Sequence, residues 1–348
     1  QNWYPSAEYE TNNTIKNVGL FDLTPFSKFE IKSNNAHKEL QKICTANIKN
    51  EAGKCVYTHM LNPDGGIETD LTVVCIEKDH FRIISSAATR ERDKFHINKH
   101  LAKDVELKDV TDDYCVFGVF GPKSRALMKS ISKDNFENDN FRFSTAKYIT
   151  IEGIKIWTQR LSYVGELGYE LYVKSKDAKK IYELLVNKGK DFNLSNCGMH
   201  AMDIMRMESG FLHWGHDISP EENQYQAGLS FTISSKKEEE FVGKKALEKI
   251  KKEKIKSRFA MFTLKDSKPG EPLLLHDEPI YLENKIIGRS TSGNYSFNFR
   301  KNLTFGYINN NISNDELHKK DLFIEIEKKK YPIELIIKPL KQTNFKNN

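Results

Sequence analysis

The sequence predicts an α+β protein that ends in a small antiparallel barrel or sandwich. Strand and helix patterns mix irregularly through residues 1–254, without the strict βαβ rhythm of a doubly wound sheet. After about residue 255 short strand patterns follow one another with turns between them, which is typical of a closed antiparallel unit. We therefore expect a first domain over 1–254, divided near residue 140, and a second domain over 255–348.

Local signals in the first half predict alternating strands and helices. Residues 27–32 (SKFEIK) alternate like a half-buried strand, and Asn34 offers an N-cap for a helix that includes Leu40 and Ile43. Pro122 opens a later helix near its first turn. The other elements predicted here are a turn at 64–66, strands at 67–76 and 81–85, and helices at 87–101 and 122–131.

The second half contains a hairpin, helices and then the strands of the terminal unit. Gly210 predicts the C-terminal cap of a helix over 199–208. A lysine-rich amphipathic helix over 244–256 should connect the two domains. The remaining predicted elements are hairpin strands at 148–151 and 155–159, a strand at 169–173, a helix at 177–188, terminal strands at 258–264, 279–282, 286–289, 303–308, 322–326 and 333–337, and a loose tail at 342–348.

Composition indicates a globular protein and argues against several functional classes. The 348 residues are 38% hydrophobic and 29% charged, and no stretch approaches the ~18 apolar residues that span a bilayer, so we expect no membrane role. The net charge of +6 is spread thinly among acids, which favours a small polyanionic ligand over nucleic acid. Five cysteines without a C-x-x-C pair indicate reduced thiols and a cytoplasmic or matrix-like compartment. Metal, dinucleotide, P-loop and hydrolase motifs are absent, so none of these sites is expected.

Asp70 is the leading candidate for chemistry. On the strand that begins at Ile67, alternate residues form an apolar face, while Glu68, Asp70 and Thr72 face the other way. A carboxylate on that face can act as an acid or base if a cleft removes it from water. The same pattern is also typical of the wet outer face of a hairpin, and the local sequence alone favours that interpretation.

Two further segments combine polar groups with turns. In residues 163–170 (YVGELGYE) two glycines suggest a tight loop that brings its backbone close to a ligand. The carboxylate of Glu170 could accept paired hydrogen bonds from the amino and ring N–H groups of a heterocycle. An ordinary strand–turn–strand would show the same pattern. Arg206 near a helix end could face a carboxylate ligand or only satisfy the helix dipole.

Taken together, these segments resemble the aminomethyltransferase family, the T-protein of the glycine cleavage system, over nearly the whole chain. The resemblance is closest to the folate-binding carboxy-terminal half of dimethylglycine and sarcosine dehydrogenases. The segments at 1–4 (QNWY) and 27–31 (SKFEI) favour this dehydrogenase branch, in which a similar stretch follows a flavin-binding domain. The other matching segments are 18–23 (VGLFDL), 61–71 (LNPDGGIETDL), 163–170 (YVGELGYE), 214–218 (WGHDI), 291–293 (TSG) and 306–307 (GY).

This resemblance implies a three-lobed ring of mixed sheet–helix subdomains around a central folate cavity, with a C-terminal antiparallel β barrel as the third lobe. It implies tetrahydrofolate as the cofactor and Asp70 as the catalytic residue beside its reactive nitrogens. The folate-binding residues that it implies are Tyr163, Glu170, Arg206, Met60, Ser86 and Phe231. Two positions depart from the family pattern, because Ser86 stands where an Asn is usual and Gln226 where a Glu is usual. These departures concern detailed pterin or substrate contacts and leave Asp70 in place.

By the same resemblance, the chain forms 5,10-methylenetetrahydrofolate from a methylene, iminium or formaldehyde unit released by demethylation of a methylated amine such as dimethylglycine or sarcosine. Its partners would be the small methylated-amine-derived substrate and a flavin-containing dehydrogenase domain or subunit, so FAD is not expected in this chain. The alternatives are a stand-alone aminomethyl- or methyltransferase acting on a protein-bound or sulfonium substrate, a non-catalytic folate-binding module, and a basic nucleic-acid binder that shares the fold. Asp70 argues against a purely binding role.

Overall fold

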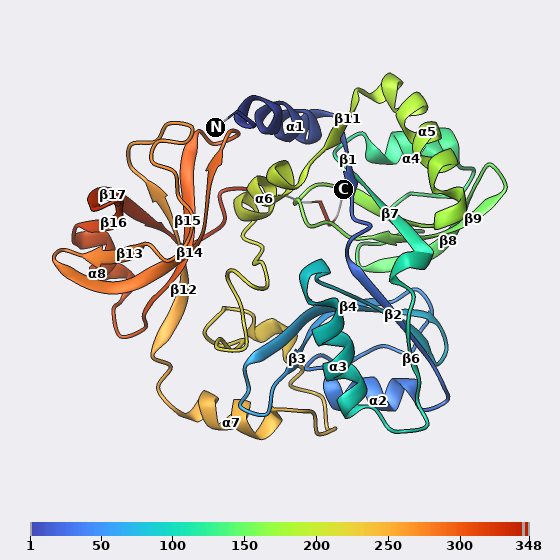
Figure 1. Ribbon diagram of the computed structural model, residues 1–348, viewed down its shortest axis with the longest axis horizontal. Coiled ribbons are helices and arrows are strands. Elements are labelled where there is room, and N and C mark those ends of the chain that lie inside the picture. The colour runs from blue at the N-terminus through green and yellow to red at the C-terminus, as the bar shows by residue number, and fades with distance from the viewer. Residues whose placement is uncertain (1, 343–344, 347–348) are drawn as a thin grey trace.

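The computed structural model describes residues 2–342 and 345–346, which form three lobes around a common centre (Figure 1). The first lobe contains a five-stranded sheet, the second a six-stranded sheet, and the third is a closed barrel of strands β12 to β17. Helices α1 (Tyr4–Lys16) and α6 (Met199–Glu208) lie where the second lobe meets the barrel. The predicted α+β fold with a terminal antiparallel barrel is therefore confirmed.

The first lobe has the strand order β3-β4-β5-β2-β6, and all neighbouring strands are antiparallel. Helix α2 covers one face of this sheet because Ala36, Leu40 and Ile43 recur at helical spacing and are buried in the core of the lobe. The elements are β2 (Ser27–Lys32), α2 (Ala36–Ile43), β3 (Cys55–Leu61), β4 (Ile67–Glu77), β5 (His80–Ser85), η1 (Ala87–Thr89), α3 (Arg90–His100), β6 (Leu107–Asp109) and η2 (Thr111–Asp113).

The start of α2 differs from the sequence prediction. Its N-cap position is Asn35 rather than Asn34, and the Asn35 side chain makes no capping hydrogen bond. The backbone carbonyl of Ser33 accepts from the Ala36 N–H at 2.8 Å, and the Ser33 hydroxyl accepts from the Asn35 N–H at 3.2 Å, so a turn precedes the helix. The prediction of Asn34 as the cap is wrong because a turn at Ser33 delays the helix.

The second lobe has the strand order β11-β1-β7-β10-β9-β8, in which only the β1–β11 pair is parallel among these described strands. Helices α4 and α5 pack on its outer face through buried Leu127, Met128, Ile181 and Leu185. The predicted hairpin, the helix at 199–208 and its cap at Gly210 (φ +73°) are confirmed. The elements are β1 (Val18–Asp22), β7 (Tyr114–Phe120), α4 (Ser124–Ile131), β8 (Thr145–Ile151), β9 (Ile154–Arg160), β10 (Gly168–Lys174), η3 (Ser175–Asp177), α5 (Ala178–Gly189), η4 (Lys190–Phe192) and β11 (Leu194–Cys197).

The third lobe follows the lysine-rich helix, which is α7 (Lys244–Lys252) and leads into β12. All six terminal strand predictions are confirmed, although β14 runs past a bulge near Ser290 and is longer than expected. Of the predicted tail, positions 343–344 and 347–348 lie outside the described residues, as does position 1 of the 1–4 segment. Before α7, the short helix η5 (Ser230–Thr232) packs against β3 of the first lobe. The elements of the third lobe are β12 (Ser257–Leu264), β13 (Pro279–Leu282), β14 (Lys285–Ser296), β15 (Lys301–Asn309), α8 (Asn314–Lys319), β16 (Leu322–Ile326) and β17 (Lys329–Ile336).

Helix α1 was not predicted, and its buried face explains why. Besides Tyr4 and Ala7, this face contains the polar residues Thr11, Asn13 and Thr14. The Asn13 amide donates to the carbonyl of Asn193 at 2.7 Å and to the hydroxyl of Ser195 at 2.8 Å. Because polar contacts hold the helix against β11, no apolar stripe exists for a periodicity argument to detect.

A core between the two sheets determines the surroundings of Asp70. Asp70 pairs with His59 across β3 and β4, and Cys55 and Val74 lie further along the same face. Cys55 and Val74 are buried in one hydrophobic cluster with Phe120 and other residues of the second lobe. The polar face of β4 therefore turns toward the second lobe, and its interpretation as the wet outer face of a hairpin is wrong.

Candidate active site between the lobes

Asp70 is half-buried on the inward face of β4. Burial raises the pKa of the Asp70 carboxyl to about 7, although a hydrogen bond with the Tyr57 hydroxyl opposes this change and the charge of Asp93 adds to it. A carboxyl with a pKa near 7 populates both protonation states at neutral pH. This is the property required of a group that gives and takes protons.

Asp93 on α3 lies behind Asp70 and is itself buried. Its carboxylate accepts hydrogen bonds from the hydroxyls of Thr69 at 3.1 Å, Ser85 at 2.7 Å and Thr89 at 2.7 Å. Burial nevertheless raises the pKa of Asp93. The two acids act on one another, so ionisation of Asp93 disfavours ionisation of Asp70.

Two residues of β3 that sequence reasoning missed complete the surroundings of Asp70. The Tyr57 hydroxyl is hydrogen-bonded to the Asp70 carboxyl and lies 3.3 Å from Nε2 of His59. Nδ1 of the buried His59 lies 3.0 Å from Oγ1 of Thr232. A regular hairpin around the predicted turn at 64–66 would have turned Thr58 and Met60 to the face of Asp70. A register shift between Met60 and Leu61 places Tyr57 and His59 there instead, and a register argument from the sequence could not have found it.

Tyr163 reaches the same region from the loop between β9 and β10. Its hydroxyl donates to the carbonyl of Leu212 at 3.0 Å. Burial raises the pKa of Tyr163, the positive charge of Arg206 lowers it, and the negative charge of Asp70 raises it. The structure thus places Tyr163 within electrostatic range of both Asp70 and Arg206, so that the three residues belong to one site.

The loop that carries Tyr163 needs a glycine where it meets α6. Gly165 has φ +68°, and a Cβ there would lie 2.0 Å from Oγ of Ser209 at the end of α6. Only glycine allows both this backbone conformation and this close approach. The predicted tight loop is confirmed at Gly165, but its close backbone contact is with Ser209 at the end of α6 and not with a ligand.

Glu170 lies on β10, on the face that is turned toward the first lobe, and is half-buried. Burial raises the pKa of Glu170 to about 7, although the Tyr172 hydroxyl donates to its carboxylate at 3.1 Å and opposes the change. Its cross-strand neighbours are Gly118 and Gln159. Gln159 is fully buried, and neither its amide nitrogen nor its amide oxygen has a hydrogen-bond partner among residues 2–342 and 345–346. The site therefore combines an ionisable acid with an unsatisfied amide.

Arg206 is buried and joins α6 to the barrel. Its Nε donates to Asp203 at 2.7 Å and its NH1 donates to Asp217 at 2.6 Å and to the carbonyl of Phe211 at 3.1 Å. Its NH2 donates to Ser292 of β14 at 2.8 Å. With 2% of its side chain exposed, the guanidinium faces protein groups, and its charge reaches the site through Tyr163.

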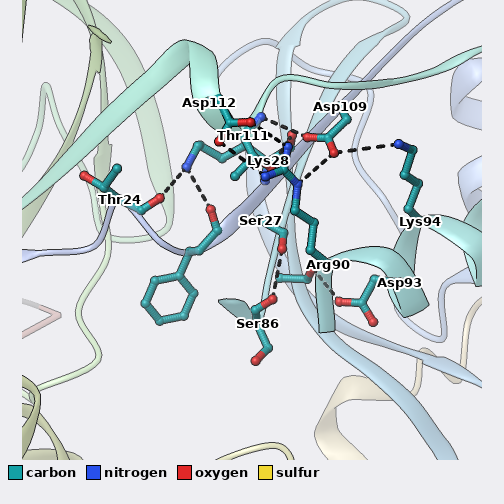
Figure 2. Close-up of polar contacts among 12 residues, drawn as sticks. Thr24, Ser27, Lys28, Ser86, Arg90, Asp93, Lys94, Asp109, Thr111 and Asp112 are labelled. Atoms are coloured by element: carbon teal, nitrogen blue, oxygen red, sulfur yellow. Dashed lines mark hydrogen bonds and ion pairs between the residues drawn. The ribbon is translucent and has the colours of Figure 1, made fainter. Parts of the chain in front are cut away.

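The other three residues named from the resemblance occupy different places. Met60 is fully buried on the opposite face of the first sheet, so the structure does not bring its side chain to Asp70. Phe231 is 75% exposed with its ring centroid 6.5 Å from that of Tyr57, which places it at the rim of the site. The carbonyl of Ser86 accepts a hydrogen bond from the Ser27 hydroxyl at 3.0 Å, as Figure 2 shows.

Gln226 has a structural position next to the barrel. Its Nε2 donates to the Ser257 hydroxyl at 2.9 Å, and its carbonyl accepts from the N–H of Phe259 at 2.8 Å. Its Oε1 accepts from the N–H of Asn223 at 3.2 Å. The side chain thus fixes the loop that leads to β12.

The described residues contain neither a metal-binding cluster nor a disulfide. Within the described part of the chain, no group of three or more His, Cys, Asp or Glu is arranged to hold a metal. None of the helices over residues 2–342 and 345–346 is long and apolar enough to cross a membrane. Each of the five cysteines is a free thiol.

Comparisons with known proteins find relatives of both parts of the chain. Residues 1–237 match the family model described as GCVT N-terminal domain, and residues 258–341 match the glycine cleavage T-protein C-terminal barrel domain. The chain is 32% identical over 343 residues to mitochondrial dimethylglycine dehydrogenase of Rattus norvegicus, a match that covers 97% of this chain and 39% of that protein. It is 31% identical over 313 residues to an aminomethyltransferase of Halothermothrix orenii, covering 88% of this chain and 85% of that protein.

The fold also matches a solved structure. The crystal structure of the glycine cleavage system aminomethyltransferase T from Bartonella henselae aligns with a TM-score of 0.86 at 19% identity, covering 96% of this chain and 89% of that chain. At this identity the match concerns the arrangement of the lobes. The chain spans about two fifths of the dimethylglycine dehydrogenase that it matches, with 39% of that protein covered.

Proposed function

Because the chain belongs to the aminomethyltransferase (GCVT) family, we propose that it binds tetrahydrofolate and catalyses one-carbon transfer onto it. The observation that carries this proposal is the position of Asp70, a carboxyl with a pKa near 7 between two lobes and in contact with Tyr57. A merely structural carboxylate on a strand is seldom held so near neutrality.

The side chains near Glu170 fit the pterin part of such a ligand. A carboxylate can accept two hydrogen bonds from an amino group and a ring N–H, and the unsatisfied amide of Gln159 offers a donor and an acceptor beside it. Buried polar atoms without partners are costly, so their presence supports a polar ligand as the missing partner.

The proposed mechanism assigns roles to residues of this chain. When bound, tetrahydrofolate supplies the nucleophilic nitrogens N5 and N10 that accept the one-carbon unit. Asp70 holds or accepts a proton and stabilises positive charge on the one-carbon donor, effects that are typically worth ~10²–10⁴-fold in rate. Glu170 and Tyr163 orient the pterin, and Tyr57 orients the carboxyl of Asp70.

The proposed donor is a methylene, iminium or formaldehyde unit from demethylation of a methylated amine such as dimethylglycine or sarcosine. The similarity to dimethylglycine dehydrogenase supports this choice, and it also supports a flavin-containing dehydrogenase domain or subunit as partner. We assign the protein to a reducing compartment such as the cytoplasm, which its five free thiols support. The domain limits 1–254 and 255–348 form part of the same proposal.

A stand-alone aminomethyltransferase is the second candidate. It is favoured by the match that covers 85% of the Halothermothrix orenii aminomethyltransferase, a protein of nearly the same extent. The two candidates share Asp70 and tetrahydrofolate and differ in the source of the one-carbon unit. Turnover with an aminomethyl group carried on a protein, and none with formaldehyde, would select the second.

The proposal is tested by calorimetric titration of the purified chain with tetrahydrofolate, followed by addition of formaldehyde and detection of 5,10-methylenetetrahydrofolate. We expect saturable folate binding and product formation faster than in buffer. The matched control is Asp139→Asn, since Asp139 is an exposed carboxylate of the second lobe. Absence of folate binding at high micromolar concentration would refute the proposal.

A further inference from the structure

A series of hydrogen bonds leads from Asp70 through a buried histidine to Thr232. It runs from the Asp70 carboxyl to the Tyr57 hydroxyl, then to Nε2 of His59, and from Nδ1 of His59 to the Thr232 hydroxyl. Tyr57 is 38% exposed, whereas His59 is fully buried. Only the first two members of the series can therefore meet a ligand, and His59 acts behind them.

The Thr232 hydroxyl determines which nitrogen of His59 carries the proton. Oγ1 of Thr232 donates its single hydrogen to the carbonyl of Leu229 at 2.7 Å. It must therefore accept at its other contacts, which are Nδ1 of His59 at 3.0 Å and Nε2 of Gln224 at 3.2 Å. A neutral imidazole has one N–H, so Nδ1 is the donor and Nε2 presents a lone pair to Tyr57.

Burial keeps this imidazole neutral. It lowers the pKa of His59 to about 3, and the contacts of the ring are with neutral hydroxyl and amide groups. The Nε2 lone pair is therefore a permanent acceptor at working pH. It competes with Asp70 for the single hydrogen of the Tyr57 hydroxyl.

The protonation state of Asp70 determines whether Asp70 or His59 accepts the hydrogen of the Tyr57 hydroxyl. When Asp70 is ionised, Tyr57 donates to the carboxylate, and the buried lone pair of His59 has no donor. When Asp70 is protonated, its O–H can donate to the Tyr57 oxygen while Tyr57 donates to His59, so that every group is paired. Because an unpaired buried acceptor costs free energy, the second arrangement is favoured by the presence of His59.

We propose that His59 is a positioning residue which, through Tyr57, stabilises the protonated form of Asp70 and so keeps a proton available at the site. The proposal rests on the proposed function for its catalytic meaning, because only a reaction that moves a proton at Asp70 would use it. Its structural content, the coupling of His59 to Asp70, can be measured without folate.

Other titratable and charged side chains also act on Asp70 and its neighbours. Tyr57 on β3 and Asp93 on α3 both act on the Asp70 carboxyl. The charge of Asp70 in turn raises the pKa of Tyr163, which lies on the loop between β9 and β10. Arg206, Asp203 and Asp217 act on Tyr163 in turn. Apart from Tyr57, none of these side chains has a hydrogen bond or ring contact with His59 among the described residues, so a change at His59 leaves the positions of Asp93 and Tyr163 relative to Asp70 intact.

The first experiment is an NMR titration of the folate-free protein. The Asp70 carboxyl is followed with ¹³C-labelled aspartate and identified by loss of its signal in Asp70→Asn, and the tautomer of His59 is read from its ring ¹⁵N shifts. We expect the Nδ1–H tautomer. We also expect the pKa of Asp70 to fall by about half a pH unit or more in His59→Leu, as loss of one net hydrogen bond requires.

Two variants and one control separate this role from general damage. His59→Gln keeps an acceptor near Tyr57 and should leave the pKa of Asp70 close to that of the wild type. Thr232→Val removes the acceptor for Nδ1–H, so the ring should switch to the Nε2–H tautomer and the pKa of Asp70 should fall as in His59→Leu. His37→Leu is the matched control, because His37 lies in the same lobe and bonds to the carbonyl of Ile48, away from Asp70.

The kinetic readout follows from the titration. The acid limb of the pH–rate profile for methylene transfer should move by the same amount as the pKa of Asp70 in each variant. An unchanged Asp70 titration in both His59→Leu and Thr232→Val, or an Nε2–H tautomer in the wild type, would overturn the proposal. If the wild type shows no folate chemistry, the proposed function fails, whereas the titration still decides the coupling of His59 to Asp70.

Discussion

Glu170 and Gln159 lie directly opposite each other in the ladder between β10 and β9, on the face turned toward the first lobe. One is a carboxyl whose pKa burial raises to about 7, and the other is a fully buried amide without a partner among the described residues. Opposite residues of an antiparallel pair have Cβ atoms roughly 5 Å apart, so both side chains can contact one ligand ring.

Glu170→Gln should weaken folate binding before it affects turnover. The variant loses the charge-assisted acceptor, and we expect the Kd for tetrahydrofolate to rise about 10-fold to 100-fold, with kcat at saturating folate within several-fold of the wild type. Calorimetry measures the Kd, and single-turnover assays measure the rate at saturating folate. Glu91→Gln, at an exposed carboxylate of α3, is the control, and an unchanged Kd in Glu170→Gln would remove Glu170 from the binding site.

Gln159→Leu should stabilise the folate-free protein while weakening folate binding. Replacing an unsatisfied buried amide by an apolar side chain of similar size removes a desolvation cost of about 1 kcal/mol or more. Urea unfolding and calorimetric titration measure the two effects. A variant that is less stable and binds folate normally would show that the amide serves the packing of β9 alone.

Asp70→Asn should abolish most turnover and keep folate affinity within several-fold. An amide cannot exchange a proton or stabilise positive charge as a carboxylate does, so we expect a loss of about 10²-fold or more in kcat. Steady-state rates and calorimetric affinities are compared with those of Asp139→Asn. Loss of binding with unchanged turnover per bound folate would give Asp70 a binding role instead.

Asp70→Asn should also change how stability depends on pH. Burial raises the pKa of Asp70 to about 7, so the folded protein binds this proton more tightly than the unfolded chain does. The resulting loss of stability is absent below the unfolded pKa near 4 and complete above about pH 7. The free energy of unfolding of Asp70→Asn relative to wild type should therefore rise between about pH 4 and about pH 7. Buried neutral His59 and His96 are common to both proteins and largely cancel in this difference. The free energies of unfolding are measured with urea at each pH. A difference between Asp70→Asn and wild type that does not change with pH would contradict this prediction.

Arg206→Lys should lower stability more than folate affinity. Lysine cannot replace the guanidinium fork that contacts Asp217, Asp203 and Ser292, and Asp217 would stay fully buried with a poorer partner. We expect a loss of about 3 kcal/mol in the free energy of unfolding. Unchanged stability together with a Kd raised more than about tenfold would instead assign Arg206 to the ligand.

Much of the fold could be predicted from local patterns. The apolar spacing in α2, the cap at Gly210 and the short strands after residue 255 report local physics, and the structure contains these elements. Helix α1 could not be predicted in this way, because Asn13 and its neighbours bury polar atoms against β11, and such contacts depend on residues almost 200 positions away.

Some residues of the candidate site could likewise be predicted from the sequence, and others could not. The family motifs identified Asp70, Tyr163 and Glu170 as functional candidates from the order of short segments. They also led to Arg206, whose four hydrogen-bonded groups turn out to tie α6 to the barrel and neighbouring loop. Tyr57 and His59 join this site only through the register shift between Met60 and Leu61. The contact of His59 with Thr232 spans 173 positions, so only the folded chain shows it.

The sequence by itself determined the α+β class, the terminal barrel and the acid on the polar face of β4, since all three follow from residue spacing within short segments. Only the tertiary structure decided that this face turns inward, because the core formed by Cys55, Val74 and the second sheet is built from segments far apart in the chain. The pKa of Asp70 near 7 has its main cause in burial, which a strand pattern alone does not determine.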